Sequence, residues 1–247
     1  MYLPDFNFHQ PVTIQDALNL LAQRSNAAPM AGGTDLLVEM KKGLRMHDDI
    51  VSLAKIPELK HIADDEQNIF IGACSTHSEV IASGLIGEIL PALVEAASKI
   101  GSDQIRNTGT IGGNICTAAS CCDTAPVLLA MNASVEIADS GSKRVVPLSD
   151  FFTFNKKTIL RSGELITRFI IPKPKSGTGA CYEKFGLREA GSISVVSVAA
   201  ALRIEDDTIT HASIVIGAVA PTPKISEQAN EILIGKKIQD LSEGSPL

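Results

Sequence analysis

Two adjacent glycines, Gly32 and Gly33, stand between a short apolar stretch and a run with helical character. Glycine adopts positive φ angles and allows close approach of the backbone, so consecutive amide groups can converge on one anion. The helix predicted at residues 36–42 would add the positive end of its dipole. This arrangement favours a phosphate or pyrophosphate site, although a plain strand–turn–helix connection would use the same residues.

A second glycine pair, Gly112 and Gly113, lies further along within Gly-Thr-Ile-Gly-Gly-Asn. Thr110 and Asn114 flank it with polar side chains, and the asparagine amide offers two N–H donors without a charge. Two such loops in one chain predict a clamp with two sides on a diphosphate. Neither loop shows the Gly-x-Gly-x-x-Gly spacing of a dinucleotide fingerprint or a following Gly-Lys-Ser/Thr. The residues alone therefore predict a phosphorylated ligand and do not identify it.

The elements that must hold these loops follow from capping signals and apolar spacing. Thr13 with Asp16 and Thr76 with Glu79 resemble capping boxes and predict the starts of two helices. Pro91 suits the first turn of a further helix. Apolar spacing predicts helices at 92–100, 125–131 and 225–233, and strands at 27–31, 50–53, 69–71, 134–138, 164–171, 181–185, 194–204 and 208–219. The chain is therefore predicted to be α+β, with a C-terminal antiparallel sheet under helical cover.

Composition excludes several classes of protein. The 247 residues carry 22 Lys and Arg against 28 Asp and Glu, and this net charge of −6 argues against nucleic-acid binding. No apolar run approaches the ~20 residues that cross a bilayer, and the N-terminus shows no secretion signal. Five cysteines are an odd number in a chain without an export signal, so we expect reduced thiols and a cytoplasmic protein.

The remaining chemistry-bearing residues are scattered. The histidines, His9, His47, His61, His77 and His211, all fall outside the two glycine motifs. The sequence therefore indicates neither a metal site nor a catalytic residue of this chain's own. The basic stretch at residues 41–47 is expected to be a solvated face.

Three motifs in one order give the chain a family resemblance. They are Ala-Gly-Gly-Thr-Asp-Leu-Leu at 31–37, Ile-Arg-Asn-Thr-Gly-Thr-Ile-Gly-Gly-Asn-Ile-Cys at 105–116, and Gly-Ala-Val-Ala-Pro-Thr-Pro at 217–223. The chain resembles the FAD-binding medium subunit of molybdenum hydroxylases, as in xanthine dehydrogenase and carbon monoxide dehydrogenase, from about Pro4 to Lys237. The resemblance implies a vanillyl-alcohol-oxidase-like (PCMH-type) FAD-binding fold. Its two α/β subdomains map to 1–55 and 56–175, and its C-terminal sheet to 176–247. Members usually continue a few tens of residues past Gly235, so the C-terminal subdomain is expected to be truncated.

The resemblance also implies which residues bind a non-covalent FAD. The pyrophosphate contacts map to Pro29, Met30, Ala31, Gly32, Gly33, Thr34, Asp35 and Leu36 on one side, and to Thr110, Gly113 and Asn114 on the other. The adenine side maps to Ile100 and Gly101, the polar part of the flavin to Asp123, the apolar isoalloxazine contact to Ile166, and the lysine of a Lys-x-x-x-Arg pattern to Lys184. Simpler alternatives are a helix cap for Asp123, a surface lysine for Lys184 and a core position for Ile166.

The function implied by the resemblance is electron transfer within an oxidoreductase complex. A [2Fe–2S] iron–sulfur subunit would supply electrons, and FAD would pass them to NAD or another acceptor. Substrate hydroxylation would occur on a separate, molybdopterin-containing large subunit. Two other hypotheses stay open: a standalone flavin-dependent oxidase or dehydrogenase of the same fold, and a non-catalytic nucleotide-binding assembly module.

Three clustered cysteines, Cys116, Cys121 and Cys122, raise the question of an iron–sulfur cluster. One branch of the family, of benzoyl-CoA reductase type, binds a [4Fe–4S] cluster near this position with ligands from an inserted loop. This chain lacks that insertion, and such a cluster needs four thiolates. We therefore expect small buried thiols and no metal.

Overall fold

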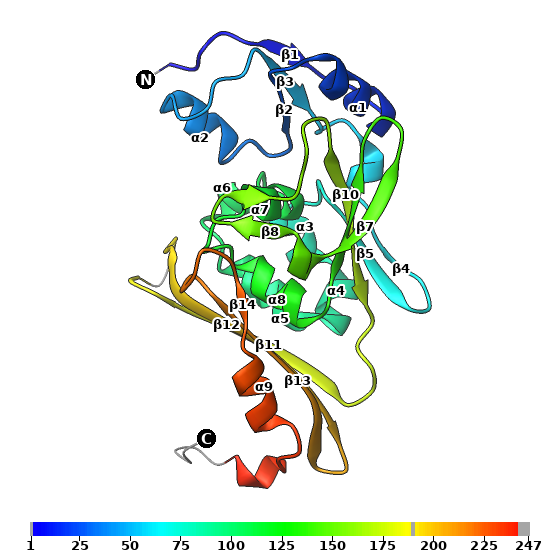
Figure 1. Cartoon of the computed structure of the whole chain (residues 1–247), viewed down its shortest axis with the longest axis vertical. Helices are drawn as coiled ribbons and strands as arrows, with labels where there is room; N and C mark the ends of the chain where they lie inside the picture. Colours follow the sequence, from blue (N-terminus) through cyan, green and yellow to red (C-terminus); the bar gives the residue numbers. More distant parts are fainter. Residues whose placement is uncertain (1, 189–190, 242–247) are drawn as a thin grey trace.

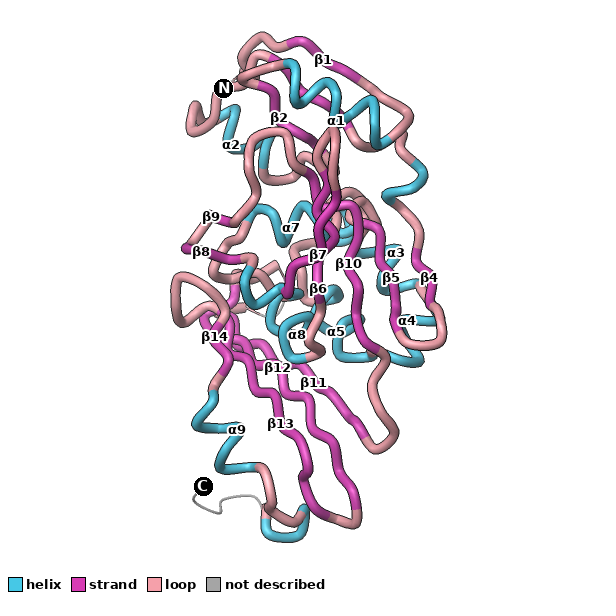
Figure 2. Tube along the Cα trace, turned by 45° about the vertical axis from the view of Figure 1, so that its right-hand side comes forward, coloured by secondary structure: helices cyan, strands magenta, loops and turns pink. Residues whose placement is uncertain are grey.

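The computed structural model describes residues 2–188 and 191–241. Its three larger sheets follow one another along the long axis of the molecule, and a fourth sheet is a two-stranded hairpin beside the middle one (Figure 1). The first sheet lies at the N-terminal end, the second in the middle, and the third at the C-terminal end. Figure 2 shows the same succession from a second side. The predicted boundaries after residues 55 and 175 fall between these sheets.

The N-terminal sheet is small and parallel, with strand order β1-β3-β2. Its elements are β1 (Asn7–His9), α1 (Ile14–Gln23), β2 (Ala27–Met30), α2 (Leu36–Lys41) and β3 (Asp49–Ser52). The hydroxyl of Thr13 accepts the amide of Asp16, so the predicted start of the first helix is confirmed. Strand β2 ends immediately before the first glycine motif, and α2 begins immediately after it. The motif is therefore held between two ordered elements.

The middle sheet has the order β4-β5-β10-β6-β7, and each neighbouring pair is antiparallel. Its strands are β4 (Ile62–Asp64), β5 (Asn68–Gly72), β6 (Ser134–Ala138), β7 (Lys143–Pro147) and β10 (Leu165–Pro172), with a hairpin of β8 (Phe152–Phe154) and β9 (Lys157–Thr158) alongside. The helices are α3 (His77–Ala82), α4 (Gly84–Ile89), α5 (Pro91–Ser98), α6 (Asp103–Arg106), α7 (Ile111–Thr117) and α8 (Thr124–Ala130). Single 3-10 turns lie at Pro57–Leu59, Leu148–Asp150 and Ile238–Asp240. The predicted capping box of Thr76 and Glu79 is present at the start of α3.

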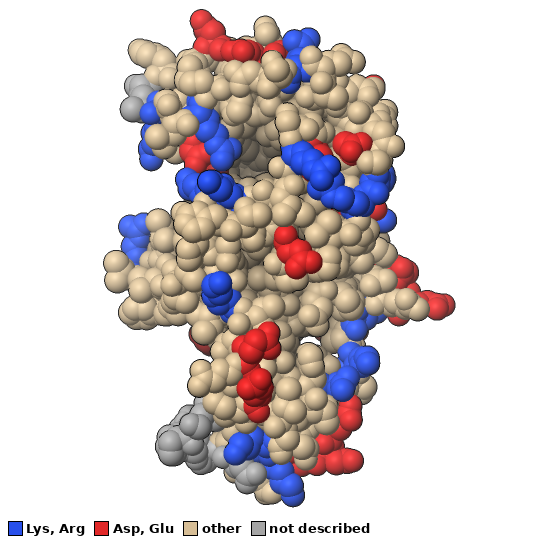
Figure 3. Space-filling view, in the orientation of Figure 1, with Lys and Arg blue, Asp and Glu red and all other residues tan. Residues whose placement is uncertain are grey.

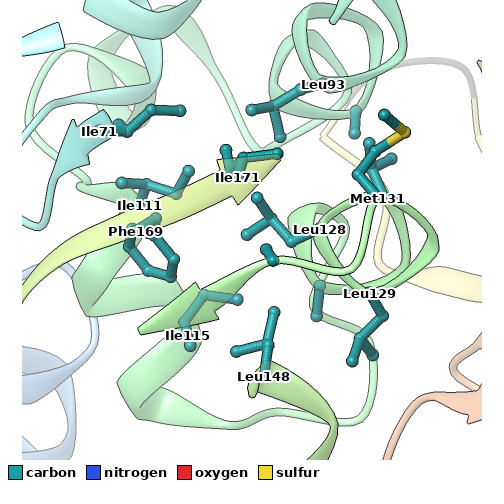
Figure 4. Close-up of a cluster of buried hydrophobic side chains, with 14 of the residues drawn as sticks. Ile71, Leu93, Ile111, Ile115, Leu128, Leu129, Met131, Leu148, Phe169 and Ile171 are labelled. Atoms are coloured by element: carbon teal, nitrogen blue, oxygen red, sulfur yellow. The ribbon is translucent and has the colours of Figure 1, made fainter. Parts of the chain in front are cut away.

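The largest hydrophobic core lies between the middle sheet and its helices. Figure 4 shows Ile71 and Phe169 from the sheet facing Ile111, Ile115 and Leu128 from α7 and α8. All five side chains are buried. Because α7 carries the second glycine motif, this core fixes the position of that motif against the sheet.

The C-terminal sheet is antiparallel with the order β11-β12-β13-β14. Its strands are β11 (Thr178–Gly186), β12 (Ser194–Glu205), β13 (Thr208–Gly217) and β14 (Lys224–Ile225), followed by α9 (Glu227–Leu233). Helix α8 contacts β12 and β13, and Tyr182, Ala199 and Val215 of this sheet join the main core. The sheet is thereby packed directly onto the unit that carries the second glycine motif.

One local prediction is wrong. The second glycine motif was expected to be a loop, but Gly112 and Gly113 lie inside α7, and Thr110 is its N-cap. The hydroxyl of Thr110 accepts the amide of Gly113 at 3.0 Å. A Cβ on Gly112 would lie 2.5 Å from the carbonyl oxygen of Ala73, so this glycine allows the helix to pack against the end of β5. Capping and packing, which are not visible in the Gly-Gly letters, turn the segment into a helix.

Among the described residues, no helix is both long enough and apolar enough to cross a bilayer.

Candidate functional site

A cavity of about 430 Å³ lies between the N-terminal unit and α7. Both glycine motifs line it. Figure 3 shows the molecule hollowed between the N-terminal and middle units, with Lys and Arg side chains on both sides of the hollow. Of the residues predicted to bind a cofactor, Pro29, Met30, Ala31, Gly32, Gly33, Thr34, Asp35, Leu36, Ile100, Thr110, Gly113 and Asn114 line this cavity. The fold thus brings together two segments that are far apart in the sequence.

The first glycine motif supplies free backbone donors. Gly33 has a φ of +72°, the left-handed conformation that the glycine pair predicted. A Cβ on Gly32 would overlap the carbonyl oxygen of Thr108, so this glycine is what allows the two motifs to touch. Among the described residues, the amides of Gly32, Gly33 and Thr34 donate no backbone hydrogen bond. These three N–H groups are available to an anion in the cavity.

In the second motif, every amide at residues 111–114 has a partner within the protein. The amide of Ile111 donates to Ser75, that of Gly112 to Ala73, and that of Asn114 to the carbonyl of Thr110. The amide of Gly113 is taken by the Thr110 hydroxyl, and its φ is not positive. The predicted glycine nest is therefore wrong on this side of the cavity. Among the described residues of this motif, only the amide of Thr110 donates no hydrogen bond, so this wall offers mainly side chains.

Asn114 is the main polar side chain on this second wall. Its Oδ1 accepts the hydroxyl of Thr124 at 2.8 Å and the thiol of Cys122 at 2.9 Å. Because both bonds end on the oxygen, the amide nitrogen remains free to donate. This arrangement agrees with the uncharged donor that the sequence predicted at Asn114.

Two contacts tie the N-terminal unit to the opposite wall. The hydroxyl of Thr117 in α7 donates to Asp35 at 3.0 Å. Glu39 pairs with Lys156 of the β8–β9 turn at 2.7 Å and with Arg45 at 2.9 Å. The hydrogen bond from Lys156, followed by the charge of Arg45, lowers the pKa of the Glu39 carboxyl despite its partial burial. The cavity is therefore bridged by polar contacts between two units.

Two histidines that sequence reasoning placed outside the site line this cavity. They are His47 and His77. Arg45 lines it as well, so the basic stretch is not only a solvated face. His77 reaches the site because the segment before α3 pairs with the segment before α7. The backbone amide of His77 donates to the carbonyl of Gly109 at 3.0 Å, and Thr76 forms an antiparallel β-bridge with Thr110. These contacts join distant parts of the chain, and no local signal in the sequence indicates them.

Asp123 and Lys184 form a buried ion pair outside the cavity lining. The ammonium nitrogen lies 2.8 Å from Oδ2 of Asp123, and the two side chains are 7% and 8% exposed. Oδ1 of Asp123 accepts the hydroxyls of Tyr182 at 2.7 Å and Ser194 at 2.5 Å. Burial, followed by the negative charge of Asp123, raises the pKa of the Tyr182 hydroxyl. Lys184 also donates to the carbonyl of Lys99, and Ile100, the residue after Lys99, lines the cavity.

The simpler alternatives for these two residues are wrong. Asp123 stands at the N-cap of α8 but makes no side-chain capping bond, because its carboxylate is used by Tyr182, Ser194 and Lys184. Lys184 is not a surface lysine, since its charge is enclosed with that of Asp123.

Two further predicted residues do not line the cavity. Ile166 is 4% exposed and packs in the main core, which agrees with the simpler alternative for this position. Gly101 has a φ of +47° and lies against Ile105, next to Ile100 in the chain. Its positive φ turns the chain from α5 toward α6.

The clustered cysteines do not assemble a metal site among the described residues. No group of three or more His, Cys, Asp or Glu side chains there is placed to hold a metal ion. Burial raises the pKa of Cys116 and of Cys122 to about 12, so both stay as thiols at neutral pH. Cys116 lines the cavity and Cys122 donates to Asn114.

Comparison with known proteins decides the family. The family described as "FAD binding domain in molybdopterin dehydrogenase" matches residues 4–174, and "CO dehydrogenase flavoprotein C-terminal domain" matches residues 180–242. The chain belongs to the FAD-binding medium-subunit family of molybdenum hydroxylases. It is a flavoprotein subunit of oxidoreductase type, and FAD is the cofactor of this family.

Relatives extend over nearly the whole chain. The nicotinate dehydrogenase FAD-subunit of Eubacterium barkeri is 34% identical over 239 residues, which are 94% of this chain and 81% of that protein. The xanthine dehydrogenase FAD-binding subunit of Escherichia coli is 34% identical over 227 residues, which are 91% of this chain and 78% of that protein. The fold is similar to a solved carbon monoxide dehydrogenase chain from Hydrogenophaga pseudoflava, with a TM-score of 0.93, 33% identity, and coverage of 96% of this chain and 83% of that one.

Proposed function

We propose that this chain binds FAD non-covalently in the cavity between its two glycine motifs and relays electrons through it. In this proposal a [2Fe–2S] iron–sulfur subunit delivers the electrons, and NAD or another acceptor takes them. A molybdopterin-containing large subunit carries out the substrate chemistry. The family membership and the relatives described as FAD-subunits and medium chains support this assignment.

The observation that carries the proposal is the set of three free amides at residues 32–34. They lie in a cavity of about 430 Å³, within the range of ~300–1,000 Å³ usual for small-molecule sites. Free N–H groups at a left-handed glycine suit a phosphate oxygen, because hydrogen bonds to a charged acceptor are the strong ones. The residues present therefore fit a dinucleotide cofactor.

Each wall has a separate role in this proposal. Residues 29–36 bind the pyrophosphate through the backbone. Thr110 and Asn114 bind polar groups of the cofactor through their side chains. FAD, when bound, supplies the electron-accepting and electron-donating chemistry. The protein positions it, shields it from water and sets the charge around it. We infer that the fold is of the vanillyl-alcohol-oxidase-like (PCMH) type, which the order of elements and the place of the cavity support.

The buried ion pair would act near the flavin without touching the pyrophosphate. Lys184 contacts the carbonyl of Lys99, and Ile100 lines the cavity, so the pair stands one residue behind the cavity wall. We propose that Asp123 and Lys184 hold this wall in place and contribute its fixed charges.

The test is flavin content. The purified chain is expected to carry one FAD, and the mass of the cofactor released by acid distinguishes FAD from FMN. Gly33→Val should abolish binding, because a β-branched residue resists a φ of +72° and displaces the free amides. Losing two charge-assisted hydrogen bonds of ~1.5–3 kcal/mol each corresponds to at least a hundredfold weaker binding.

Gly43→Val is the matched control. Gly43 has nearly the same φ, +70°, but does not line the cavity, and a Cβ there meets nothing within 4 Å. The two variants share the backbone strain, while a Cβ at Gly33 also meets Met30 at 3.0 Å and Leu37 at 3.2 Å. FAD retained in Gly43→Val would therefore show that the loss at Gly33 comes from the site and not from backbone strain alone. Full FAD in Gly33→Val would overturn the assignment. Co-purification with an iron–sulfur and a large subunit supports the relay, and a flavoprotein that turns over alone supports a standalone oxidase.

A further inference from the structure

His77 is a buried polar side chain in the cavity wall that the family motifs do not use. His77 is the first residue of α3 and is buried, with 2% of its surface exposed. It lines the same cavity as both glycine motifs. Its Nδ1 is buried and has no hydrogen-bond partner among the described residues. A buried polar side chain without a partner in a ligand cavity needs an explanation.

The two ring nitrogens have different surroundings. Nδ1 is fully enclosed, whereas Nε2 is not among the enclosed atoms and makes no hydrogen bond to a described residue. Burial lowers the pKa of His77 to about 4, with a smaller contribution from Arg106 against an opposing one from Asp123. The ring is therefore neutral at pH 7 and carries one proton, which must sit on one nitrogen or the other.

The enclosed position of Nδ1 selects the tautomer. An unpaired, buried N–H group is rarer in proteins than an acceptor that lacks a partner. The proton therefore sits on Nε2, and the bare lone pair sits on Nδ1. Because His77 lines the cavity and Nε2 is its nitrogen that is not enclosed, this neutral N–H is the donor that the ring can offer there.

We propose that His77 donates a hydrogen bond from Nε2 to an acceptor atom of the bound flavin nucleotide and so positions it. This inference rests on the proposed function, because it requires FAD in the cavity. The ligand atom is an unprotonated oxygen or ring nitrogen, and a cationic or donor group would not be recognised. His77 is a positioning residue, since nothing in its setting gives it a proton to exchange at neutral pH.

The experiment measures FAD binding and the tautomer separately. Apo protein is titrated with FAD by flavin fluorescence for the wild type, His77→Gln and His77→Leu. Glutamine keeps an N–H donor, so its Kd is expected to stay within about threefold of wild type, whereas leucine is expected to raise the Kd by about tenfold or more. His61→Leu is the control, because His61 is exposed and its Nδ1 already contacts the carbonyl of Glu58.

Long-range proton–nitrogen NMR of histidine-labelled protein gives the second readout. The His77 ring is expected to show the Nε2–H pattern, and its Nε2 signal should shift on addition of FAD. Separate additions of ADP and riboflavin, which carry the pyrophosphate and the isoalloxazine respectively, show which half holds the acceptor. Failure of the wild type to bind FAD would refute the proposed function. FAD binding that is unchanged in His77→Leu, or an Nδ1–H pattern, would refute this inference alone.

Discussion

Replacing Lys184 with methionine is expected to destabilise the protein by about 3 kcal/mol. Methionine keeps most of the apolar stem and removes the ammonium group, so the change isolates the charge. The Asp123 carboxyl would then stand in a position that is 8% exposed, without its only cationic partner among the described residues. Removing one member of a buried pair leaves an uncompensated charge, which costs ~3–5 kcal/mol.

The hydrogen bonds around Asp123 put the expected loss of stability at the lower end of this range of ~3–5 kcal/mol. Oδ1 of Asp123 keeps the hydroxyls of Tyr182 and Ser194, and only Oδ2 loses its donor. Each retained hydrogen bond to the carboxylate contributes ~1.5–3 kcal/mol and replaces part of its lost solvation. Lys156→Met is a matched control, because Lys156 makes an ion pair of similar length, 2.7 Å, but is 50% exposed. We expect a loss of ~0–1 kcal/mol there.

A double-mutant cycle measures the pairing itself. Urea unfolding of the apo protein, followed by circular dichroism, gives the free energy of unfolding for Lys184→Met, Asp123→Asn and the double variant. The double variant leaves no buried charge, so its loss should be clearly smaller than the sum of the single losses, with a coupling of about 2 kcal/mol. A loss below ~1 kcal/mol for Lys184→Met, or additive losses, would refute the description of this pair as a buried, mutually dependent unit.

Three further results are expected. His77 has a pKa near 6.5 in the unfolded chain and about 4 in the folded protein, so the free energy of unfolding should fall as the pH drops between these values. From pH 7 to pH 5 the loss should be roughly 2 kcal/mol. Urea unfolding at several pH values should show that His77→Leu removes this part of the pH dependence. Gly32→Ala should lower the stability of the protein, because the added Cβ overlaps the carbonyl of Thr108. Gly87→Ala lies within a helix and its Cβ meets open space, so it should raise the stability by ~0.5–1 kcal/mol in the same assay. Iron and acid-labile sulfide should be absent from the purified chain, and about four irons per chain would show that a cluster forms.

The features that sequence reasoning predicted well depend on neighbouring residues. The Thr13 and Thr76 caps are local, because a side chain three residues from its partner amide is all they require. The positive φ of Gly33 is local for the same reason, since glycine between a strand and a helix is the cheapest way to turn the chain. The long strands β12 and β13 are also found near their predicted positions, because their apolar runs are long enough to outweigh other conformations.

The features that were missed depend on contacts between distant residues. His77 lies in the cavity only because the segment after β5 meets the turn before α7. Arg45 follows α2 in a stretch that looks fully solvated in the sequence, yet it reaches the cavity and pairs with Glu39. Nothing in the local spacing of either residue distinguishes it from an ordinary surface or core position.

The two glycine motifs show why equal letters can have unequal roles. Both contain Gly-Gly with a threonine nearby, but the first pair precedes α2, whereas the second lies inside α7. Within the described part of the chain, no backbone carbonyl accepts the amides of residues 32–34, so they stay free. At residues 111–114 the chain packs against Ala73 and Ser75, and every amide has a protein partner. An anion in this cavity must therefore bind chiefly to the first motif, and the glycines of the second serve the packing that brings Thr110 and Asn114 to face it.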